Sequence, residues 1–518
     1  MKPYAEIALQ EYNTLSVRPG GVNGNPFWNI NSSQFTFVPA FSFPSLPNEL
    51  AKEILFTATD EKGGVHTFKA KKTSAPLTPV WAEIPTGLVN LKVEALNNKG
   101  EPTYLLGART FFKCAPFPGR ENLPEKARSY KEAAELGFKY FFEQPMIQYW
   151  LEHGKPDPEF PHNVYPSKTF SSVISAMLTY SKLSSKNAKQ ALNIAKIVAD
   201  YMLSITYGES SPLCGLPPTY CFDNLNAEKV NRIAPAAEGS KNTVMTIYPA
   251  SAGLAYLELF KATSDKKYFD AARAIANYYK DTVLPNGSWY LLISVTDGLP
   301  VKFNYCAHFG ILKFLNSFNK ITNEAVWEVL AENYFQYLKQ TCLDKYNFEG
   351  QFEDSPVTEN YYNLTNISAS NMVKYIVDNK SDDARLVDAA TELMRFIEDQ
   401  FVVWDEYAPW IKEANPEVRS PAGLEQYFCY WPIDSSTSTI MTAFLKMYSL
   451  TKNRLYYEKA AALGDMLTRM QNPKSGVIPT FWTSEKDIEE LENFWINCHI
   501  FSATSLFELA EISKEVEG

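Results

Sequence analysis

The residues best suited to chemistry lie in one stretch, Glu425 to Thr439, which reads EQYFCYWPIDSSTST. Two carboxylates, Glu425 and Asp434, flank a group of aromatic rings and a thiol. Pro432 suits the start of a helix, and Asp434 or Ser435 can cap that helix by accepting amide hydrogen bonds of its first turn. Aromatic faces beside carboxylates at the mouth of a helix predict a sugar-binding cleft. A capped core helix with buried rings is the alternative interpretation.

Carboxylates elsewhere in the loops bear on the same chemistry. Cleavage of a glycosidic bond needs two carboxyl groups, one with a raised pKa that protonates the leaving oxygen. Glu425 and Asp434 belong to one loop and can face one cleft, with Asp405 in reserve. Each can instead be a solvated charge, and Asp434 can be a helix cap. Other loop candidates are Glu349, Glu353, Asp354, Glu359 and Glu406.

A second group of side chains suits proton abstraction. A Tyr or His can remove the proton α to a uronate carboxylate while Asn, His or Arg neutralises that carboxylate. Asn304, Tyr305 and His308 supply these types within a short segment. A satisfied structural role is the alternative for each histidine. Similar sets are His162 with Tyr165, and Asn497 with His499.

Further ring and guanidinium side chains are expected to bind substrate because they lie in or beside long polar loops. A planar guanidinium can hold the carboxylate of an acidic sugar, and aromatic faces can stack on sugar rings. A surface salt bridge is the competing role for each arginine. The additional predicted binding residues are Arg232, Tyr248, Tyr361, Trp404, Arg419, Tyr430, Trp431 and Trp482.

These loops alternate with a helical repeat that runs from about residue 125 to the end. Each loop leads into an apolar segment, and all but the last of these segments are followed by a short turn and a charged amphipathic segment. The apolar segments begin near Phe170, Ile247, Cys306, Ile367, Ser436 and Cys498. The amphipathic segments are expected at 187–203, 266–283, 324–340, 383–400 and 454–470, with a sixth at 125–142.

Alternation of apolar and amphipathic helices predicts a closed ring. An apolar helix needs cover on every side, whereas a one-faced helix can form an outer wall. Six inner and six outer helices satisfy both needs if 125–142 closes the ring against the final apolar segment. We therefore expect a mainly α fold, an (α/α)6 toroid over residues 119–518, with an open helical solenoid as the alternative. The long loops then meet at one end of the ring, where we expect the site.

Residues 1–118 are predicted to be β structure that forms a small N-terminal β-sandwich domain. Short strands separated by turns are typical of such a fold, and PTGLVNLKVEA at residues 85–95 resembles immunoglobulin-like or fibronectin-type modules. The segment at 116–119 is expected to be a linker. Two hairpins are expected, from strands at 54–59 and 65–70 and from strands at 89–95 and 104–112.

Composition excludes several classes of function. The 518 residues carry a net charge of −10, which argues against a nucleic-acid partner because phosphate contacts need a basic face. No apolar stretch is long enough to span a bilayer. The first residues lack the apolar segment of a signal peptide, so we expect a cytoplasmic protein, or a periplasmic or extracellular one whose signal was removed. No nucleotide-binding, metalloprotease or serine-hydrolase motif occurs in its proper context.

The seven cysteines are scattered, and none has the CxxC spacing of a zinc or redox site. A disulfide between Cys214 and Cys221 is possible in an oxidising compartment, although free thiols are the commoner outcome. We expect no metal and no cofactor.

Residues 425–434, with TRMQ at 468–471 and IPTFW at 478–482, resemble six-hairpin enzymes that trim uronic-acid glycans, nearest to glycoside hydrolase family 154, the β-glucuronidases. The resemblance implies an exo-acting hydrolase for a glucuronate-bearing oligosaccharide or polysaccharide. Glu425 and Asp434 lead as acid/base or nucleophile, although no motif transfers the family's catalytic residues position by position. A uronate lyase using Tyr305 and His308, and a non-catalytic glycan-binding protein, are the alternatives.

Overall fold

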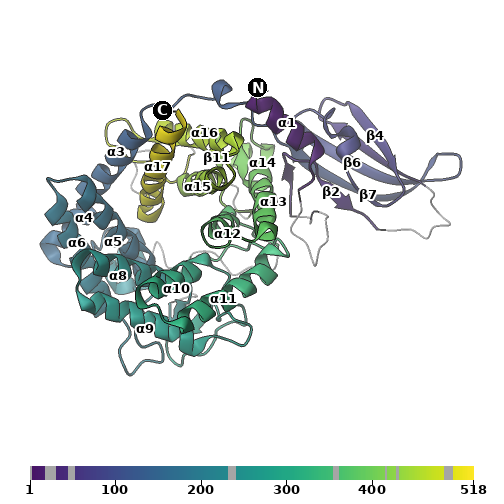
Figure 1. The fold of residues 1–518 in the computed structure, drawn as a ribbon. Helices are drawn as coiled ribbons and strands as arrows, with labels where there is room; N and C mark the ends of the chain where they lie inside the picture. Colours follow the sequence, from purple (N-terminus) through teal and green to yellow (C-terminus); the bar gives the residue numbers. More distant parts are fainter. Residues whose placement is uncertain are drawn as a thin grey trace.

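The protein is a ring of helices with a β-rich lobe on one side (Figure 1). The computed structural model describes residues 3–17, 28, 31–44, 53–230, 241–353, 361–414, 417–427, 431–482 and 494–517.

Six inner helices of the described chain surround the centre of the ring. Each packs against the next, and α17 packs against α5, so the ring is closed (Figure 1). This closure excludes the open solenoid. The inner helices are α5 (Pro166–Leu183), α8 (Pro249–Thr263), α10 (Phe309–Thr322), α12 (Asn366–Asn379), α15 (Asp434–Thr451) and α17 (Ile496–Glu517).

Each inner helix pairs with an outer helix, close to the ranges expected from the sequence. The last inner helix, α17, packs against the first outer helix, α3, as the repeat predicts. A short helix that the repeat does not predict, α4 (Pro145–His153), follows α3. The outer helices are α3 (Tyr130–Glu143), α6 (Ala188–Ser204), α9 (Lys266–Thr282), α11 (Ala325–Leu338), α13 (Ala384–Phe401) and α16 (Arg454–Met470).

Local chemistry explains why the inner-to-outer turns are short. The inner helices α10 and α15 end at Asn323 and Lys452, whose φ values of 53° and 56° place them in the left-handed region that ends a helix in one residue. The outer helices α13 and α16 each begin with a side-chain cap. Asp383 accepts a 3.0 Å bond from the Arg385 amide at the start of α13, and Asn453 accepts a 3.1 Å bond from the Leu455 amide at the start of α16.

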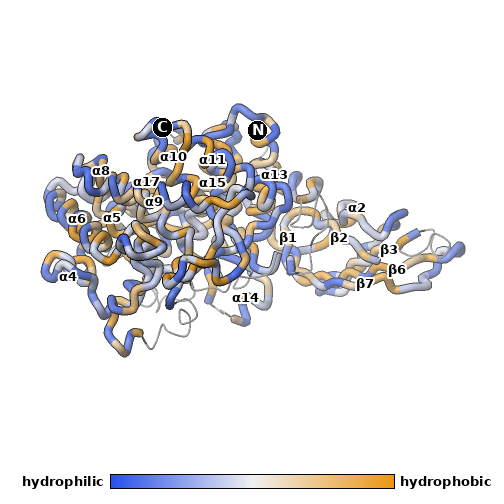
Figure 2. Tube along the Cα trace, turned by 90° about the horizontal axis from the view of Figure 1, so that it is seen from below, coloured by the Kyte–Doolittle hydropathy of each residue, from blue (hydrophilic) through white to orange (hydrophobic). Residues whose placement is uncertain are grey.

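The lobe contains a five-stranded sheet in the order β1-β7-β6-β3-β4, and both expected hairpins are present. Inward residues of β3 are buried and alternate with more exposed ones, as the changing hydropathy along the strands in Figure 2 illustrates. A full sandwich and a domain boundary at residue 118 stay predictions. The strands of this sheet are β1 (Gln34–Phe35), β3 (Glu53–Asp60), β4 (Val65–Ala70), β6 (Gly87–Leu96) and β7 (Pro102–Lys113), and the pair β2 (Ala40–Ser42) and β5 (Ser74–Pro76) lies apart.

The start of the chain corrects the expectation of β structure throughout residues 1–118. Residues Tyr4–Thr14 form a helix, α1, which buries Ala8 and Tyr12 and packs against α16. Within the described residues, no helix is both long and apolar enough to cross a membrane.

Candidate active site

A cavity of about 580 Å³ lies at the end of the ring where the long loops meet. All six inner helices or the loops before them contribute to its wall, mostly through residues in their first turns. The loop end is therefore hollow, as the sequence predicts. The wall comprises Lys168, Ser172, Tyr248, Ser251, His308, Gln351, Phe352, Ile367, Asn371, Glu425, Gln426, Ile433, Ser435, Thr439, Thr480, Phe481, Trp495, Asn497, Cys498 and Phe501.

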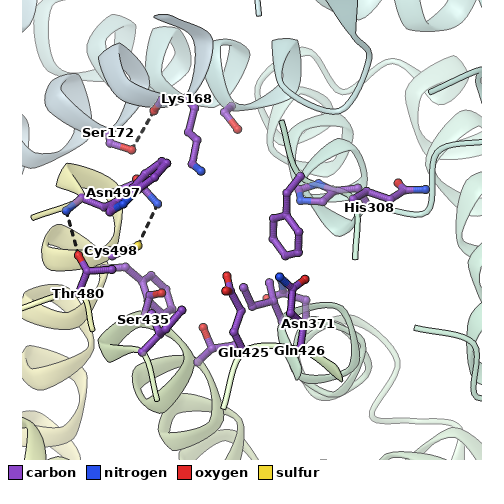
Figure 3. A pocket seen from close by; sticks show the side chains of 18 of the residues that line it. Lys168, Ser172, His308, Asn371, Glu425, Gln426, Ser435, Thr480, Asn497 and Cys498 are labelled. Atoms are coloured by element: carbon purple, nitrogen blue, oxygen red, sulfur yellow. Dashed lines mark hydrogen bonds between the residues drawn. The ribbon is translucent and has the colours of Figure 1, made fainter. Parts of the chain in front are cut away.

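Glu425 is a half-buried carboxylate on this wall, and its backbone is firmly held. The Glu425 amide donates to the Trp431 carbonyl at 3.2 Å, and the Glu425 carbonyl accepts from the Asn366 amide at 3.1 Å. Figure 3 shows the Glu425 carboxylate pointing into the cavity, with Lys168 pointing in from the opposite side. An acid and a cation therefore face the same space from different parts of the ring.

Lys168 is positioned by a buried acid. Its ammonium forms an ion pair with Glu353, whose side chain is fully buried, and it lies 4.7 Å from the centre of the Trp495 ring. The hydroxyl of Tyr248 donates to the same carboxylate, and the hydroxyl of Tyr220 donates to the Glu353 carbonyl at 3.0 Å. The ion pair and hydrogen bonds compensate for the cost of burying the charge of Glu353. They fix Lys168 and Tyr248 on the wall.

Asp434 lies outside the wall, although the next residue, Ser435, belongs to it. The carboxyl is fully buried in the first turn of α15, and its Oδ2 accepts a 2.9 Å hydrogen bond from Ser502. Within the described residues, its Oδ1 has no hydrogen-bond partner. Burial raises the pKa of Asp434 well above its usual value, and the charge of Glu425 raises it further. Both carboxylates were expected to face one cleft. Of the two, Glu425 faces it and Asp434 does not.

His308 lines the cavity and also starts a helix. Its Nδ1 accepts a 3.1 Å hydrogen bond from the Gly310 amide, which caps α10. Burial lowers the pKa of His308 to about 4, although Glu353 acts in the opposite direction. The ring is therefore neutral near pH 7. Because Nδ1 accepts, Nε2 carries the proton in this arrangement.

The other two candidate histidines lie behind the wall. The ring of His162 packs 3.6 Å from that of Trp495, and burial lowers its pKa to about 3. His499 is fully buried and uses both ring nitrogens. Its Nδ1 accepts from the Ile478 amide at 3.1 Å, and its Nε2 donates to the Gly137 carbonyl at 2.9 Å. His499 is a structural residue, which corrects its assignment to substrate binding.

Several predicted aromatic residues support the wall or the core without lining the cavity. Tyr165 is buried with its ring stacked 6.3 Å from Trp495, and Trp431 packs against the wall residue Phe481 at 5.1 Å. Trp404 and Trp482 are fully buried, and the Trp404 indole donates to Glu398 at 3.1 Å. The last two are core residues because their rings fill space between packed elements.

The remaining predicted residues lie away from the cavity. Tyr305 is 39% exposed and stacks on Tyr290, and its neighbour Asn304 also lies outside the wall. Asp405 and Arg419 are exposed on the surface, and the Tyr361 carbonyl accepts a bond from Asn31 of the lobe. These positions correct their assignment to the site. Arg232 and Tyr430 lie outside the described residues.

Sequence reasoning overlooked polar residues in the first two turns of the inner helices. Lys168 on α5 and Asn371 on α12 both line the cavity. Their place near the loop end of an inner helix was the available signal. Cys214 and Cys221 are unbonded, and the described residues contain no group of His, Cys, Asp and Glu suited to a metal ion.

No protein family and no curated protein matches the sequence. Among solved structures, a D-mannose isomerase aligns with a TM-score of 0.51 and 12% identity over 74% of this chain and 97% of its own. Cellobiose 2-epimerases align from Spirochaeta thermophila DSM 6192 (TM-score 0.50, 10% identity, 74% and 98% covered) and from Bacillus thermoamylovorans B4167 (0.50, 11%, 72% and 98%). At these identities the likeness shows a shared, mainly helical ring fold.

Proposed function

We propose that this protein is a glycoside hydrolase that acts on a glycan bearing a uronic acid. The observation that carries the proposal is the placement of Glu425 and Lys168 on opposite sides of a cavity walled by aromatic rings and amides. A sugar needs flat apolar faces and several hydrogen-bonding groups, and this wall offers both. The resemblance of residues 425–434 to glycoside hydrolase family 154 agrees with this proposed activity.

Each group of the wall has a role in the proposed reaction. Glu425 is the carboxyl group that reaches the cavity, so it acts as the general acid/base at the glycosidic oxygen. Lys168 binds the carboxylate of the uronic acid, with Trp495 and Phe481 beside the sugar ring. Asp434 is buried behind the wall with a raised pKa, so the proposed reaction assigns it no step at the sugar.

The test is turnover of a panel of glucuronate-bearing oligosaccharides and aryl glucuronides. Glu425→Gln is expected to reduce kcat by at least about 100-fold, the usual contribution of a general acid/base. Asp405→Asn is the matched control, because this exposed carboxylate does not line the cavity and its substitution should leave kcat unchanged. Full activity of Glu425→Gln would remove that residue from the mechanism. Binding of every glycan without turnover would instead indicate a glycan-binding protein.

A uronate lyase is the second candidate, because His308 and Lys168 both line the cavity. Lys168 can compensate the charge of the uronate carboxylate, and the protonated Nε2 of neutral His308 can donate a hydrogen bond to it. Tyr305, the expected partner, lies outside the wall. A lyase product contains a conjugated double bond that absorbs at roughly 230 nm, whereas a hydrolase product does not. Absorbance during turnover therefore separates the two reactions.

A further inference from the structure

A second cavity, of about 810 Å³, lies inside the ring beyond the candidate active site. It extends along α10 from His308 to Lys320 and reaches Asn379, the last residue of α12. His308, Asn371 and Phe501 line both cavities, so the two adjoin at these side chains. This second cavity approaches the opposite end of the ring, where short turns join the inner helices to the outer ones. The sequence gives no reason to expect a site at that end.

Three lysines line this second cavity. Lys313 and Lys320 are two helical turns apart on α10 and share a face, and Lys374 stands on the neighbouring helix α12. Within the described chain, none of the three forms an ion pair. Lys374 makes a long, 3.5 Å hydrogen bond to Thr442 and lies 5.4 Å from the centre of the Phe501 ring.

Nearby lysines outside this set are paired. Lys380 binds Glu332 at 2.7 Å, and Lys446 binds Asp378 at 2.8 Å. The pairing with Lys446 neutralises Asp378, which also lines the cavity. The other acid of the lining is Glu508, which forms no ion pair within the described chain and feels the charges of Lys374 and Lys446.

Lys374 is the partly buried lysine of the three, whereas Lys313 and Lys320 are exposed. Burial lowers the pKa of Lys374 to about 8, and Lys313 and Lys446 lower it further, while Glu508 and Asp378 act in the opposite direction. An anion between Lys313 and Lys374 would offset both the repulsion and the lost hydration. Amide and hydroxyl groups that can donate to such an anion line the same space: Asn316, Ser317, Asn371 and Thr504.

We propose that this second cavity binds a small multivalent oxyanion of the sulfate or phosphate type at Lys313, Lys320 and Lys374. The multiple negative charges of sulfate or phosphate can pair with several lysine ammonium groups. Its tetrahedrally arranged oxygens can accept hydrogen bonds from donors on several helices. The site is separate from the proposed hydrolysis, since its lysines do not line the candidate active site.

Isothermal titration of the full chain with sodium sulfate at constant ionic strength tests the proposal. We expect one sulfate per chain, and we expect Lys313→Met and Lys374→Met each to weaken binding at least about tenfold, the effect of losing one charge-assisted hydrogen bond. Lys261→Met is the matched control, because Lys261 is exposed in the last turn of α8 and lines neither cavity. Lys313→Arg should retain binding, which separates loss of charge from misfolding.

The pH dependence gives a second readout. Sulfate keeps its charge between pH 7 and 9, whereas Lys374 loses its proton near pH 8, so affinity should fall over this range. Lys313, Lys446, Asp378 and Glu508 also face Lys374. In Lys374→Met the decline should disappear.

Two results would overturn the proposal. One is the absence of sulfate and phosphate binding by the wild type, or equal binding by Lys313→Met and Lys261→Met. The other is binding of D-glucuronate, but not of sulfate or phosphate, with the same dependence on Lys313, which would assign the cavity to a glycan carboxylate. Neither measurement uses turnover, so failure here leaves the proposed hydrolysis untouched.

Discussion

Asp434 and Ser502 are joined by a 2.9 Å hydrogen bond that ties α15 to α17 beside the candidate active site. Ser438 donates in turn to the Ser502 hydroxyl at 2.9 Å, so three polar groups share a buried network between two inner helices. Burial raises the pKa of the Asp434 carboxyl group well above its usual value, which favours its protonated form. The polar character of α15 thus has a structural cause.

Asp434→Asn is expected to make stability less dependent on pH. The unfolded carboxyl ionises near its usual pKa of 3.8, whereas the folded one holds its proton to much higher pH. Stability therefore falls as pH rises above 3.8 until the folded pKa is reached. Asparagine is neutral throughout, so urea unfolding at pH 5, 7 and 9 should show a smaller decline. The expectation would be contradicted if Asp434→Asn were clearly less stable than the wild type at pH 8 while the control, Asp405→Asn, kept the stability of the wild type.

Lys168→Met is expected to destabilise the protein by about 3–5 kcal/mol, because it leaves the buried Glu353 without its cation. The double variant Lys168→Met/Glu353→Gln should recover part of this loss, since the uncompensated charge is gone. Urea unfolding of the two variants and wild type measures the effect. Additive losses in the double variant would show that the ion pair does not couple the two side chains.

His499→Leu is expected to lower stability by roughly 1–3 kcal/mol for each backbone group left without a partner. These groups are the Ile478 amide and the Gly137 carbonyl. His153→Leu is the control, because His153 is exposed at the end of α4. An equally small effect of both substitutions would refute the structural role of His499.

The same histidine should contribute to acid sensitivity. Burial lowers the pKa of folded His499 to about 4, against 6.5 when exposed. Its contribution to stability is complete above pH 6.5 and is lost as pH falls toward 4, because the unfolded chain then binds more protons. His499→Gln should therefore flatten the stability curve between pH 6.5 and 4. An unchanged slope would assign acid sensitivity to other groups, such as His308.

Tyr12→Phe is expected to loosen the contact between α1 and the ring. The Tyr12 hydroxyl donates to Glu398, which also forms a buried 2.7 Å ion pair with Lys459. Loss of one hydrogen bond to a charged group should cost about 1.5–3 kcal/mol. Unfolding by urea and proteolysis within residues 3–17 measure the effect. Tyr4→Phe, on the same helix but without such a bond, is the control and should behave as wild type.

The helices could be predicted from the sequence because their signals are local. Asp383 and Asn453 mark the starts of outer helices by side-chain capping, and apolar spacing identifies the inner ones. Residues 4–14 were wrongly predicted as β structure together with the strands that follow. Their Ala, Glu, Leu and Gln residues favour the helix that forms.

The candidate site could be predicted only in part. His308 lies on the wall as the cap of α10, and Glu425 lies there in the loop before α15, and both positions were visible in the repeat. The pairing of Lys168 with Glu353 joins α5 to a loop far along the chain, so no spacing rule reveals it. His499 looked available for substrate, yet α3 passes behind it and supplies the Gly137 carbonyl.

Closure of the ring has a consequence for synthesis of the protein. The first outer helix, α3, packs against the last inner helix, α17, so α3 lacks its inner partner until nearly all of the ring has been translated. Contacts of such large sequence separation form slowly, because the long intervening chain must first be brought together. During translation, the apolar faces of the early helices therefore remain open to chaperones or to aggregation.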